Sequence, residues 1–287
     1  EEWKPDLIVC DEMDFGAMIA AERFGIPHAT VIVLTAGGFT RPDLVAESLD
    51  EVRAEHGLPP DPDVVMPGRY LLIEPSPPSF RDPHHPLPAG ARRIRPYVLE
   101  AEAAANAPAW IEELDRADDP VIYFTLGTIF NLESGDLFTR MLDGLRELPA
   151  RIVVTVGKEL DPERFGPQPA NVRIERFVPQ ATLLPHCDLA ISHGGSGSIT
   201  GALAFAVPQI VIPMGADQLH NAARVEALGV GVALDAVDLT PESVHATVLA
   251  MLANAPAREA SVRMRDEILA LPPSAAAIPW LEALVRS

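Results

Sequence analysis

The sequence is poor in cysteine, in aromatic residues and in basic residues. Only two of its 287 residues are cysteine, Cys10 and Cys187, and both lie at the edges of apolar runs. That placement fits buried thiols better than a disulfide framework or a metal cluster. No apolar run approaches the roughly 20 residues needed to cross a bilayer, so no membrane partner is expected. We expect a globular protein of the reducing cytoplasm.

The shortage of basic residues also argues against nucleic acid as a partner. The 22 lysines and arginines face 41 aspartates and glutamates, which gives a formal net charge of −19. Such a field repels polyanions, and no basic stripe with interleaved aromatic residues offsets it. No cluster of His, Cys and carboxylate residues has the spacing of metal ligands, and no cofactor is expected.

Short β-branched runs alternate with segments of helical periodicity, which predicts the α/β class with parallel strands joined by crossover helices. The pattern weakens in the proline-rich region 42–96, which we interpret mainly as loops, and a domain boundary is expected near residues 100–119. We expect a partial first domain with its linker at 1–107, a second domain at 108–270 and a terminal helix at 271–287. The expected strands are residues 6–10, 29–34, 70–73, 121–126, 152–156, 172–177, 189–192, 209–212 and 231–234.

A glycine-rich turn between a predicted strand and a predicted helix is the most informative stretch, with the sequence His-Gly-Gly-Ser-Gly-Ser at 193–198. Backbone amides in such a turn, together with the positive end of a helix dipole, suit a phosphate or diphosphate. The imidazole of His193 and the hydroxyls of Ser196 and Ser198 offer further hydrogen bonds. The glycines by themselves also fit a tight turn with no ligand.

Other short motifs flank this turn in a definite order. Phe177-Val178-Pro179-Gln180 precedes it, and Ala206-Val207-Pro208-Gln209, Pro213, Asp217-Gln218 and Asn221-Ala222 follow. This arrangement resembles the donor-binding signature of inverting nucleotide-sugar glycosyltransferases with two Rossmann-like domains across a cleft (GT-B), above all the bacterial enzymes of polyketide and macrolide biosynthesis. The resemblance covers nearly the whole chain and is densest from 121 to 234. It implies two doubly wound domains, the first incomplete.

The resemblance implies a role for each matched residue at the donor site. Phe177 is the platform for the nucleobase, where many relatives have tryptophan; the Val178 backbone pairs with the base, and Gln180 contacts the ribose. Asp217 and Gln218 bond the sugar hydroxyls. The diphosphate site comprises a turn at Gly127 and Thr128 and the residues His193, Gly195, Ser196, Gly197 and Ser198. These positions follow predicted strands, at the edge where open α/β sheets bind ligands.

Simpler interpretations of some of these residues stay open. Phe177 also fits a core position at a strand end, and Asp217 also fits a helix N-cap. The histidines at 186 and 220 are more typical of surface or packing positions than of catalysts. The pair Asp61 and Asp63 matches the Asp-x-Asp pattern of metal-dependent glycosyltransferases, but it lies in a proline-rich loop, so no metal site is predicted there.

Asp11 is the candidate catalytic residue of the first domain. In the family an aspartate after this strand orients a histidine that deprotonates the acceptor hydroxyl, the logic of any His–Asp pair. Asp14 is a weaker competitor, and Asp11 also fits a cap on the helix that begins near Phe15. The family carries that histidine on an earlier strand and glycine turn. Neither is found in residues 1–10, so we expect a fragment or the ordered remainder of a longer chain, with activity that needs the other residues.

A second departure from the family concerns the donor. Relatives that use uridine donors carry a glutamate eight residues after the loop histidine, where it grips both ribose hydroxyls; here that position is Gly201. The loss of that carboxylate suits a deoxyribose, which lacks the 2′-hydroxyl. A thymidine diphosphate sugar is therefore the expected donor, with a uridine diphosphate sugar as the alternative.

The sequence thus predicts an inverting, metal-independent glycosyltransferase that moves a sugar, or a deoxysugar, to a small hydrophobic aglycone. Two other functions stay open: a non-catalytic nucleotide-sugar-binding fragment or auxiliary protein, and a nucleotide-sugar epimerase. The epimerase needs carboxylates after the glycine turn, and the helix at 199–205 has none. A homodimer is also left open.

Overall fold

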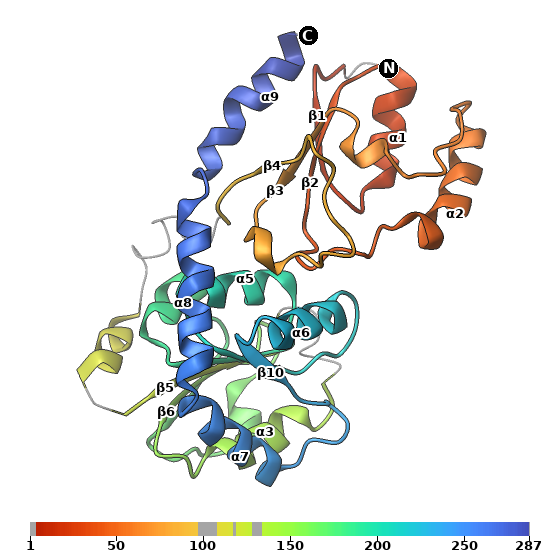
Figure 1. Cartoon of the computed structure of the whole chain (residues 1–287). Helices are drawn as coiled ribbons and strands as arrows, with labels where there is room; N and C mark the ends of the chain where they lie inside the picture. Colours follow the sequence, from red (N-terminus) through yellow and green to blue (C-terminus); the bar gives the residue numbers. More distant parts are fainter. Residues whose placement is uncertain (1–3, 97–107, 117–118, 128–133, 287) are drawn as a thin grey trace. The chain divides into compact units, whose positions relative to one another are not determined.

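The computed structural model describes residues 4–96, 108–116, 119–127 and 134–286. The chain packs into two compact units (Figure 1). Unit 1 comprises Glu1–Tyr97 and Ile268–Ser287, and unit 2 comprises Val98–Glu267.

Unit 1 contains a parallel sheet with the strand order β1-β2-β3-β4. Helices α1 and α2 cover one face, where buried side chains such as Met18 and Leu49 form the core. Helix α1 begins at Asp14, whose carboxylate accepts from the amide of Ala17 at 3.0 Å, and it ends at Gly25 in the left-handed conformation. The elements are β1 (Ile8–Asp11), α1 (Phe15–Phe24), β2 (His28–Val31), α2 (Pro42–Glu55), β3 (Leu71–Glu74) and β4 (Arg92–Arg93).

The end of the chain covers the other face of this sheet. Helix α8 (Ala255–Ala270) stops before Pro272 and Pro273, and α9 (Ala277–Arg286) follows. The predicted apolar face of the last helix is confirmed, because Trp280, Leu281 and Leu284 pack against the core formed by β2 and β3. The stretch Ala255–Arg286 is long and apolar enough to span a membrane by length and composition, although the proline pair interrupts its helix.

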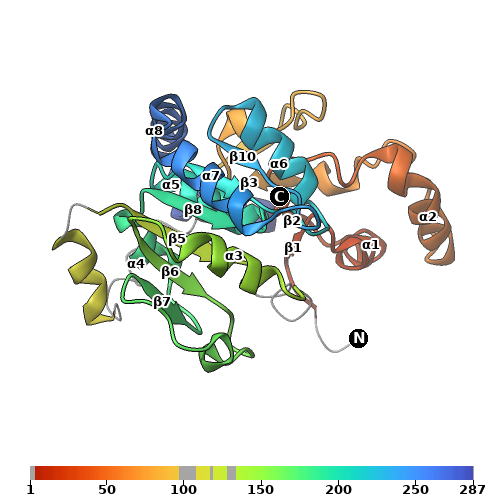
Figure 2. The same ribbon diagram turned by 90° about the horizontal axis from the view of Figure 1, so that it is seen from below.

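Unit 2 contains a parallel sheet with the order β10-β9-β8-β5-β6-β7. Helices α3 (Leu137–Leu145) and α7 (Pro241–Leu252) cover one face, and α5 (Ser196–Ala204) with the 3₁₀ helix Ala109–Arg116 covers the other (Figures 1 and 2). Both faces of β5 are therefore buried, as in other doubly wound sheets. The strands are β5 (Val121–Thr125), β6 (Arg151–Thr155), β7 (Val172–Glu175), β8 (Leu189–Ser192), β9 (Gln209–Val211) and β10 (Gly231–Ala233); α4 (Gln180–Leu183) and α6 (Gln218–Ala227) complete the unit.

The strand order creates a switch point beside β5. The chain runs outward from β5 through β6 to β7 and then returns to β8 on the opposite side of β5. Connections leave β5 and β8 in opposite directions, which opens a crevice at their carboxyl ends. The predicted α/β class with parallel sheets is confirmed, and the crevice locates the first place to look for a ligand.

Candidate functional site

The predicted glycine turn lies at the carboxyl end of β8, next to the switch point. Gly194 adopts φ +83°, and α5 begins at Ser196 with Gly195 at its N-cap. The predicted helix start at 199 was three residues late, so Ser196, Gly197 and Ser198 form the first helical turn. Amides of a first turn have no acceptor within their own helix, and with the helix dipole they suit an anion.

The imidazole of His193 is enclosed by two glycines. A Cβ atom on Gly127 would lie 2.5 Å from Cε1 of the ring, and one on Gly195 would lie 2.5 Å from Nε2. Gly127 also has φ +76°, which favours glycine. Burial lowers the pKa of His193, and the nearby carboxylate of Asp217 partly opposes this shift. A neutral imidazole donates one N–H. Thr128, predicted beside Gly127, lies outside the described residues.

Asp217 ties the glycine turn to the start of α6. Its Oδ2 accepts from Ser196 Oγ at 2.6 Å and from Asn221 Nδ2 at 2.8 Å. Asn221, which is fully buried, also donates to the carbonyl of Gly194 at 2.9 Å. Asp217 occupies the N-cap position of α6, yet its side chain makes no capping bond. The N-cap position expected for Asp217 in the alternative interpretation is confirmed, although its carboxylate bonds Ser196 and Asn221 rather than the helix amides. Asn221, which was not among the predicted site residues, supports both turns.

Gln218 is buried, and its Oε1 holds the loop that precedes α6. It accepts from the amides of Met214 at 2.7 Å and Gly215 at 3.2 Å. This side chain thus orders the segment between β9 and α6, beside the network of Asp217.

Phe177 lies past the end of β7, which is shorter than predicted because its pairing with β6 stops at Glu175. Its side chain is 57% exposed, so the core interpretation is wrong. Val178 is buried beside it. A cavity of about 530 Å³ opens next to this aromatic ring, and its lining includes Gly127, Lys158, Phe177, Val178 and Gln180.

A buried row of hydroxyls lines the inner end of the same cavity. Tyr123 Oη and Thr155 Oγ1 are 2.9 Å apart, and Thr155 Oγ1 donates to Thr125 Oγ1 at 2.9 Å. Gln180 also hydrogen-bonds Tyr123, and burial raises the pKa of the phenol. The tyrosine therefore remains protonated and can orient Gln180 at the cavity wall. The sequence pattern gave no sign of this row, because these residues looked like ordinary strand positions.

In unit 1, Asp11 lies at the end of β1, and its Oδ1 accepts from the amide of Met13 at 2.7 Å. Asp14 caps α1 instead, so the cap interpretation of Asp11 is wrong. The next residue, Glu12, was not predicted as a site residue. It is buried, its Oε1 accepts from the amides of Val33 at 2.9 Å and Leu34 at 2.7 Å, and burial raises its pKa.

Glu12 borders a cavity of about 340 Å³ above the carboxyl ends of the unit 1 strands, with a lining that includes Ile32, Thr40, Leu72, Arg81 and His85. Arg81 Nη1 lies 3.4 Å from the buried carboxylate of Glu74, and Arg81 Nε donates to the carbonyl of His85 at 2.6 Å. The cavity therefore combines apolar walls with a fixed guanidinium and a carboxyl group.

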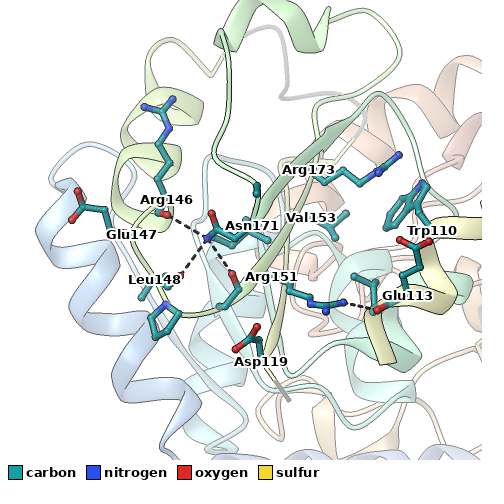
Figure 3. Close-up of a pocket in the computed structure, with 15 residues that line it drawn as sticks. Trp110, Glu113, Asp119, Arg146, Glu147, Leu148, Arg151, Val153, Asn171 and Arg173 are labelled. Atoms are coloured by element: carbon teal, nitrogen blue, oxygen red, sulfur yellow. Dashed lines mark hydrogen bonds between the residues drawn. The ribbon is translucent and has the colours of Figure 1, made fainter. Parts of the chain in front are cut away.

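A larger cavity, of about 800 Å³, lies at the amino ends of β5, β6 and β7 (Figure 3). Its three arginines, Arg146, Arg151 and Arg173, are already engaged. Arg173 lies over the Trp110 ring at 4.3 Å and pairs with Glu175, while Arg151 donates to the carbonyl of Glu113. Asn171 donates to three carbonyls of the neighbouring loop, as the dashed lines in Figure 3 show. We therefore interpret this cavity as part of the packing between these segments and not as a ligand site.

The residues considered from the sequence for metal binding have other roles in the structure. Asp61 is buried, and its two oxygens accept from the amides of Val65 at 3.0 Å and Met66 at 2.8 Å, so it shapes its own loop. Within the described ranges, no group of three His, Cys or carboxylate residues could hold a metal ion. Cys10 and Cys187 are free thiols, as predicted, and burial raises the pKa of both.

Comparisons with known proteins converge on one family. Residues 139–284 match the family described as the C-terminal domain of erythromycin biosynthesis protein CIII-like proteins. Over 99% of its length the chain is 32% identical to 4'-demethylrebeccamycin synthase of Lentzea aerocolonigenes and covers 75% of that protein. It is 29% identical to 3-alpha-mycarosylerythronolide B desosaminyl transferase of Saccharopolyspora erythraea, with 99% of this chain and 69% of the relative covered.

A solved structure agrees with the sequence matches. The spinosyn rhamnosyltransferase SpnG, crystallised with thymidine diphosphate, superposes with a TM-score of 0.81 at 27% identity, covering 98% of this chain and 74% of SpnG. SpnG is also known with the spinosyn aglycone. The predicted GT-B glycosyltransferase fold is confirmed. The chain belongs to the erythromycin biosynthesis protein CIII-like family and is a glycosyltransferase.

Proposed function

We propose that this glycosyltransferase moves a deoxysugar, with inversion, from a thymidine diphosphate donor to a small hydrophobic natural-product acceptor. The observation that carries the proposal is the position of His193 and the first turn of α5 at the switch point of the unit 2 sheet. The proteins named above support it, because one is a desosaminyl transferase and SpnG is a rhamnosyltransferase crystallised with thymidine diphosphate.

The proposed donor subsites follow the strand order along one edge of the sheet. Asp217 follows β9 and is assigned to the sugar, and the buried Gln218 would hold the loop beside it. His193 and the α5 turn follow β8 and are assigned to the diphosphate. Gly127 follows β5, and the cavity beside Phe177 lies at the ends of β6 and β7. Phe177 would stack on the base, the Val178 backbone would pair with it, and Gln180 would bond the ribose. Neighbouring strands lie about 4.8 Å apart, so an extended ligand can cross all five.

In the proposed reaction, an acceptor hydroxyl attacks the anomeric carbon as the diphosphate departs. Negative charge grows on the leaving diphosphate, and the α5 amides, the helix dipole and His193 would stabilise it. We assign to Asp11 the role of orienting the histidine that deprotonates the acceptor hydroxyl, because a carboxylate fixes an imidazole tautomer and offsets the imidazolium charge. In a protein that carries the histidine base as well as Asp11, the substitution Asp11→Asn is then expected to lower kcat at least about tenfold with little change in the donor KM, and a mutant with normal kcat contradicts this role.

The acceptor is assigned to the cavity of about 340 Å³ in unit 1. It opens beside Glu12, the neighbour of Asp11, and its mixture of apolar walls with Arg81 and Glu12 suits a hydrophobic ring system that carries a few polar substituents. SpnG with its aglycone is the solved precedent for an acceptor complex in a similar protein. A cytoplasmic location, a homodimer and the absence of a membrane partner stay predictions.

Donor choice rests on position 201. Gly201 is buried in α5 and offers no carboxylate to a ribose 2′-hydroxyl. An unmatched hydroxyl costs about 1–3 kcal/mol, so we expect thymidine diphosphate to bind about tenfold or more tightly than uridine diphosphate. Competition calorimetry with the two nucleotides tests the proposal. Equal affinity, or a preference for uridine, would overturn the donor assignment, and no binding of either nucleotide would overturn the proposed function.

A further inference from the structure

The loop after β6 places one particular side chain beside the proposed base platform. Gly157, with φ +88°, turns the chain at the end of the strand, and Lys158 follows. Arg176, which precedes Phe177, donates from Nη1 to the carbonyls of Lys158 at 3.3 Å and Leu160 at 3.2 Å. The loop is therefore fixed to the end of β7, and the backbone of Lys158 is held in place.

The ammonium of Lys158 lies 5.6 Å from the centroid of the Phe177 ring, within the range of a cation–π contact. Among the described residues no carboxylate pairs with this ammonium. The chain has only two lysines, Lys4 and Lys158, against 20 arginines. One of the two thus lines the cavity of about 530 Å³ beside an exposed aromatic ring.

We propose that Lys158 is a specificity-determining residue that reads the base of the donor nucleotide, donating from Nζ to a carbonyl oxygen of a pyrimidine stacked on Phe177. This inference rests on the proposed function, because it assumes a nucleoside diphosphate at this edge. It adds the class of base: a diketo pyrimidine, such as thymine, rather than an aminopyrimidine.

Topology favours the base over the diphosphate as the partner of Lys158. His193 and the first turn of α5, the main part of the proposed diphosphate site, follow β8, and Lys158 follows β6, two strands farther along the sheet. Gly127, the other described part of that site, follows β5 and lies one strand from Lys158. Two strand spacings correspond to about 10 Å. Lys158 and Phe177 therefore lie together at the carboxyl ends of β6 and β7, whereas His193 lies on the other side of β5.

The chemistry of an ammonium sets the preference. It carries three donors and no acceptor. Thymine presents a carbonyl oxygen at position 4, whereas cytosine presents an amino donor there. The amino group of cytosine finds no acceptor on the Lys158 ammonium, so cytosine loses a hydrogen bond that thymine keeps. The partly positive amino hydrogens would also face the positive charge of the ammonium.

The test is calorimetric titration of the whole chain with thymidine diphosphate, deoxycytidine diphosphate and inorganic pyrophosphate. Lys158→Met keeps the apolar stem and removes the charge, Lys158→Arg restores a cationic donor, and Lys4→Met makes the same charge change at the other lysine. We expect Lys158→Met to weaken thymidine diphosphate about tenfold, the size of one hydrogen bond to a charged group, and to change the other two ligands less than twofold. Lys158→Arg recovers most of the loss, and Lys4→Met leaves all three affinities unchanged.

The outcomes separate this inference from the proposed function. A wild-type chain that binds thymidine diphosphate, with an unchanged preference over deoxycytidine diphosphate in Lys158→Met, overturns the inference alone. An equal loss of pyrophosphate affinity shows a phosphate contact and overturns it as well. A wild-type chain that binds no thymidine diphosphate overturns both. Lysine acetylation read by mass spectrometry supplies a second measurement: thymidine diphosphate should protect Lys158 and not Lys4, and equal acetylation of Lys158 with and without nucleotide contradicts the contact.

Discussion

The imidazole of His193 lies against the α-carbon of Gly127, where β8 and β5 end side by side in the unit 2 sheet. A single added Cβ on Gly127 would come 2.5 Å from Cε1 of that ring. A residue at the end of one strand therefore fixes the side chain at the end of its neighbour, and the space left for His193 depends on glycine at 127.

Gly127→Ala should displace His193 and weaken thymidine diphosphate binding about tenfold or more. Alanine at φ +76° also costs about 1–2 kcal/mol of backbone strain, which lowers the melting temperature. Gly166→Ala is the matched control, because Gly166 has φ +67° and an added Cβ there meets nothing within 4 Å. Both variants should lose stability, and only Gly127→Ala should lose affinity. Equal affinities in the two variants contradict the contact.

His193→Ala should weaken nucleoside diphosphate binding by about 1.5–3 kcal/mol, the scale of a hydrogen bond to a charged group. Unchanged affinity in a folded mutant would remove His193 from the site.

Binding should also be coupled to proton uptake at His193. Burial lowers the pKa of the free imidazole, and a bound diphosphate stabilises the imidazolium, so ligand binding raises the pKa again. Affinity should therefore rise as the pH falls below 7. Calorimetry in buffers of different ionisation enthalpy measures the protons taken up, and His193→Gln should take up fewer. Identical proton uptake in the wild type and His193→Gln contradicts the coupling.

The pH dependence of stability has the opposite sign. Because the pKa of His193 is lowered in the folded state, the unfolded chain is protonated at a higher pH than the folded chain. The contribution of His193 to the free energy of unfolding is therefore complete above the ordinary pKa of 6.5 and decreases as the pH falls below it. Urea unfolding of the wild type and His193→Gln between pH 5 and pH 8 should show this difference.

Asn221→Leu should weaken nucleotide binding and destabilise the chain by about 1–3 kcal/mol, because it removes the buried donor to the carbonyl of Gly194 and leaves Asp217 with Ser196 Oγ in place of two donors. Asn171→Leu is the control: its amide donates to three carbonyls at the amino ends of the strands, away from the proposed site. Urea unfolding should show a loss in both variants, and calorimetry should show weaker nucleotide binding only in Asn221→Leu. A parallel loss of binding in Asn171→Leu would mean that stability alone explains the effect.

Glu12→Gln should keep or raise stability at neutral pH. Burial raises the pKa of Glu12, so the folded state favours the protonated carboxyl, and wild-type stability falls as the pH rises above the ordinary value of 4.5. Glutamine keeps the oxygen that accepts from Val33 and Leu34 and removes the charge. Urea unfolding from pH 4 to pH 8 should show that the free energy of unfolding of the variant, relative to that of the wild type, increases with pH. A variant that loses stability relative to the wild type over that range contradicts the account.

Much of the fold and the phosphate turn could be predicted because their signals are local. Buried parallel strands are continuous apolar runs, and the strand Leu189–Ser192 and the helix Phe15–Phe24 were predicted at their observed bounds. The glycines at 194, 195 and 197 mark a strand-to-helix turn for the same reason. Strand ends that depend on pairing with a neighbouring strand were predicted less accurately. The edge strand β7, for example, ends where its pairing with β6 ends.

The residues that were missed depend on contacts between distant segments. Asn221 is important because the glycine turn, some 27 positions earlier, presents a carbonyl to it. Glu12 holds the chain after β2, and the Tyr123 row forms only when β5 and β6 lie side by side. The two-residue strand β4 and the 3₁₀ helix Ala109–Arg116 carried too short a pattern to be recognised.

The most direct test of the donor site is a crystal structure of the chain with thymidine diphosphate. The diphosphate should lie over the first turn of α5 within hydrogen-bond distance of His193, with thymine stacked on Phe177. A nucleotide bound instead in the cavity at the amino ends of the strands, beside Trp110 and Arg173, would contradict the account.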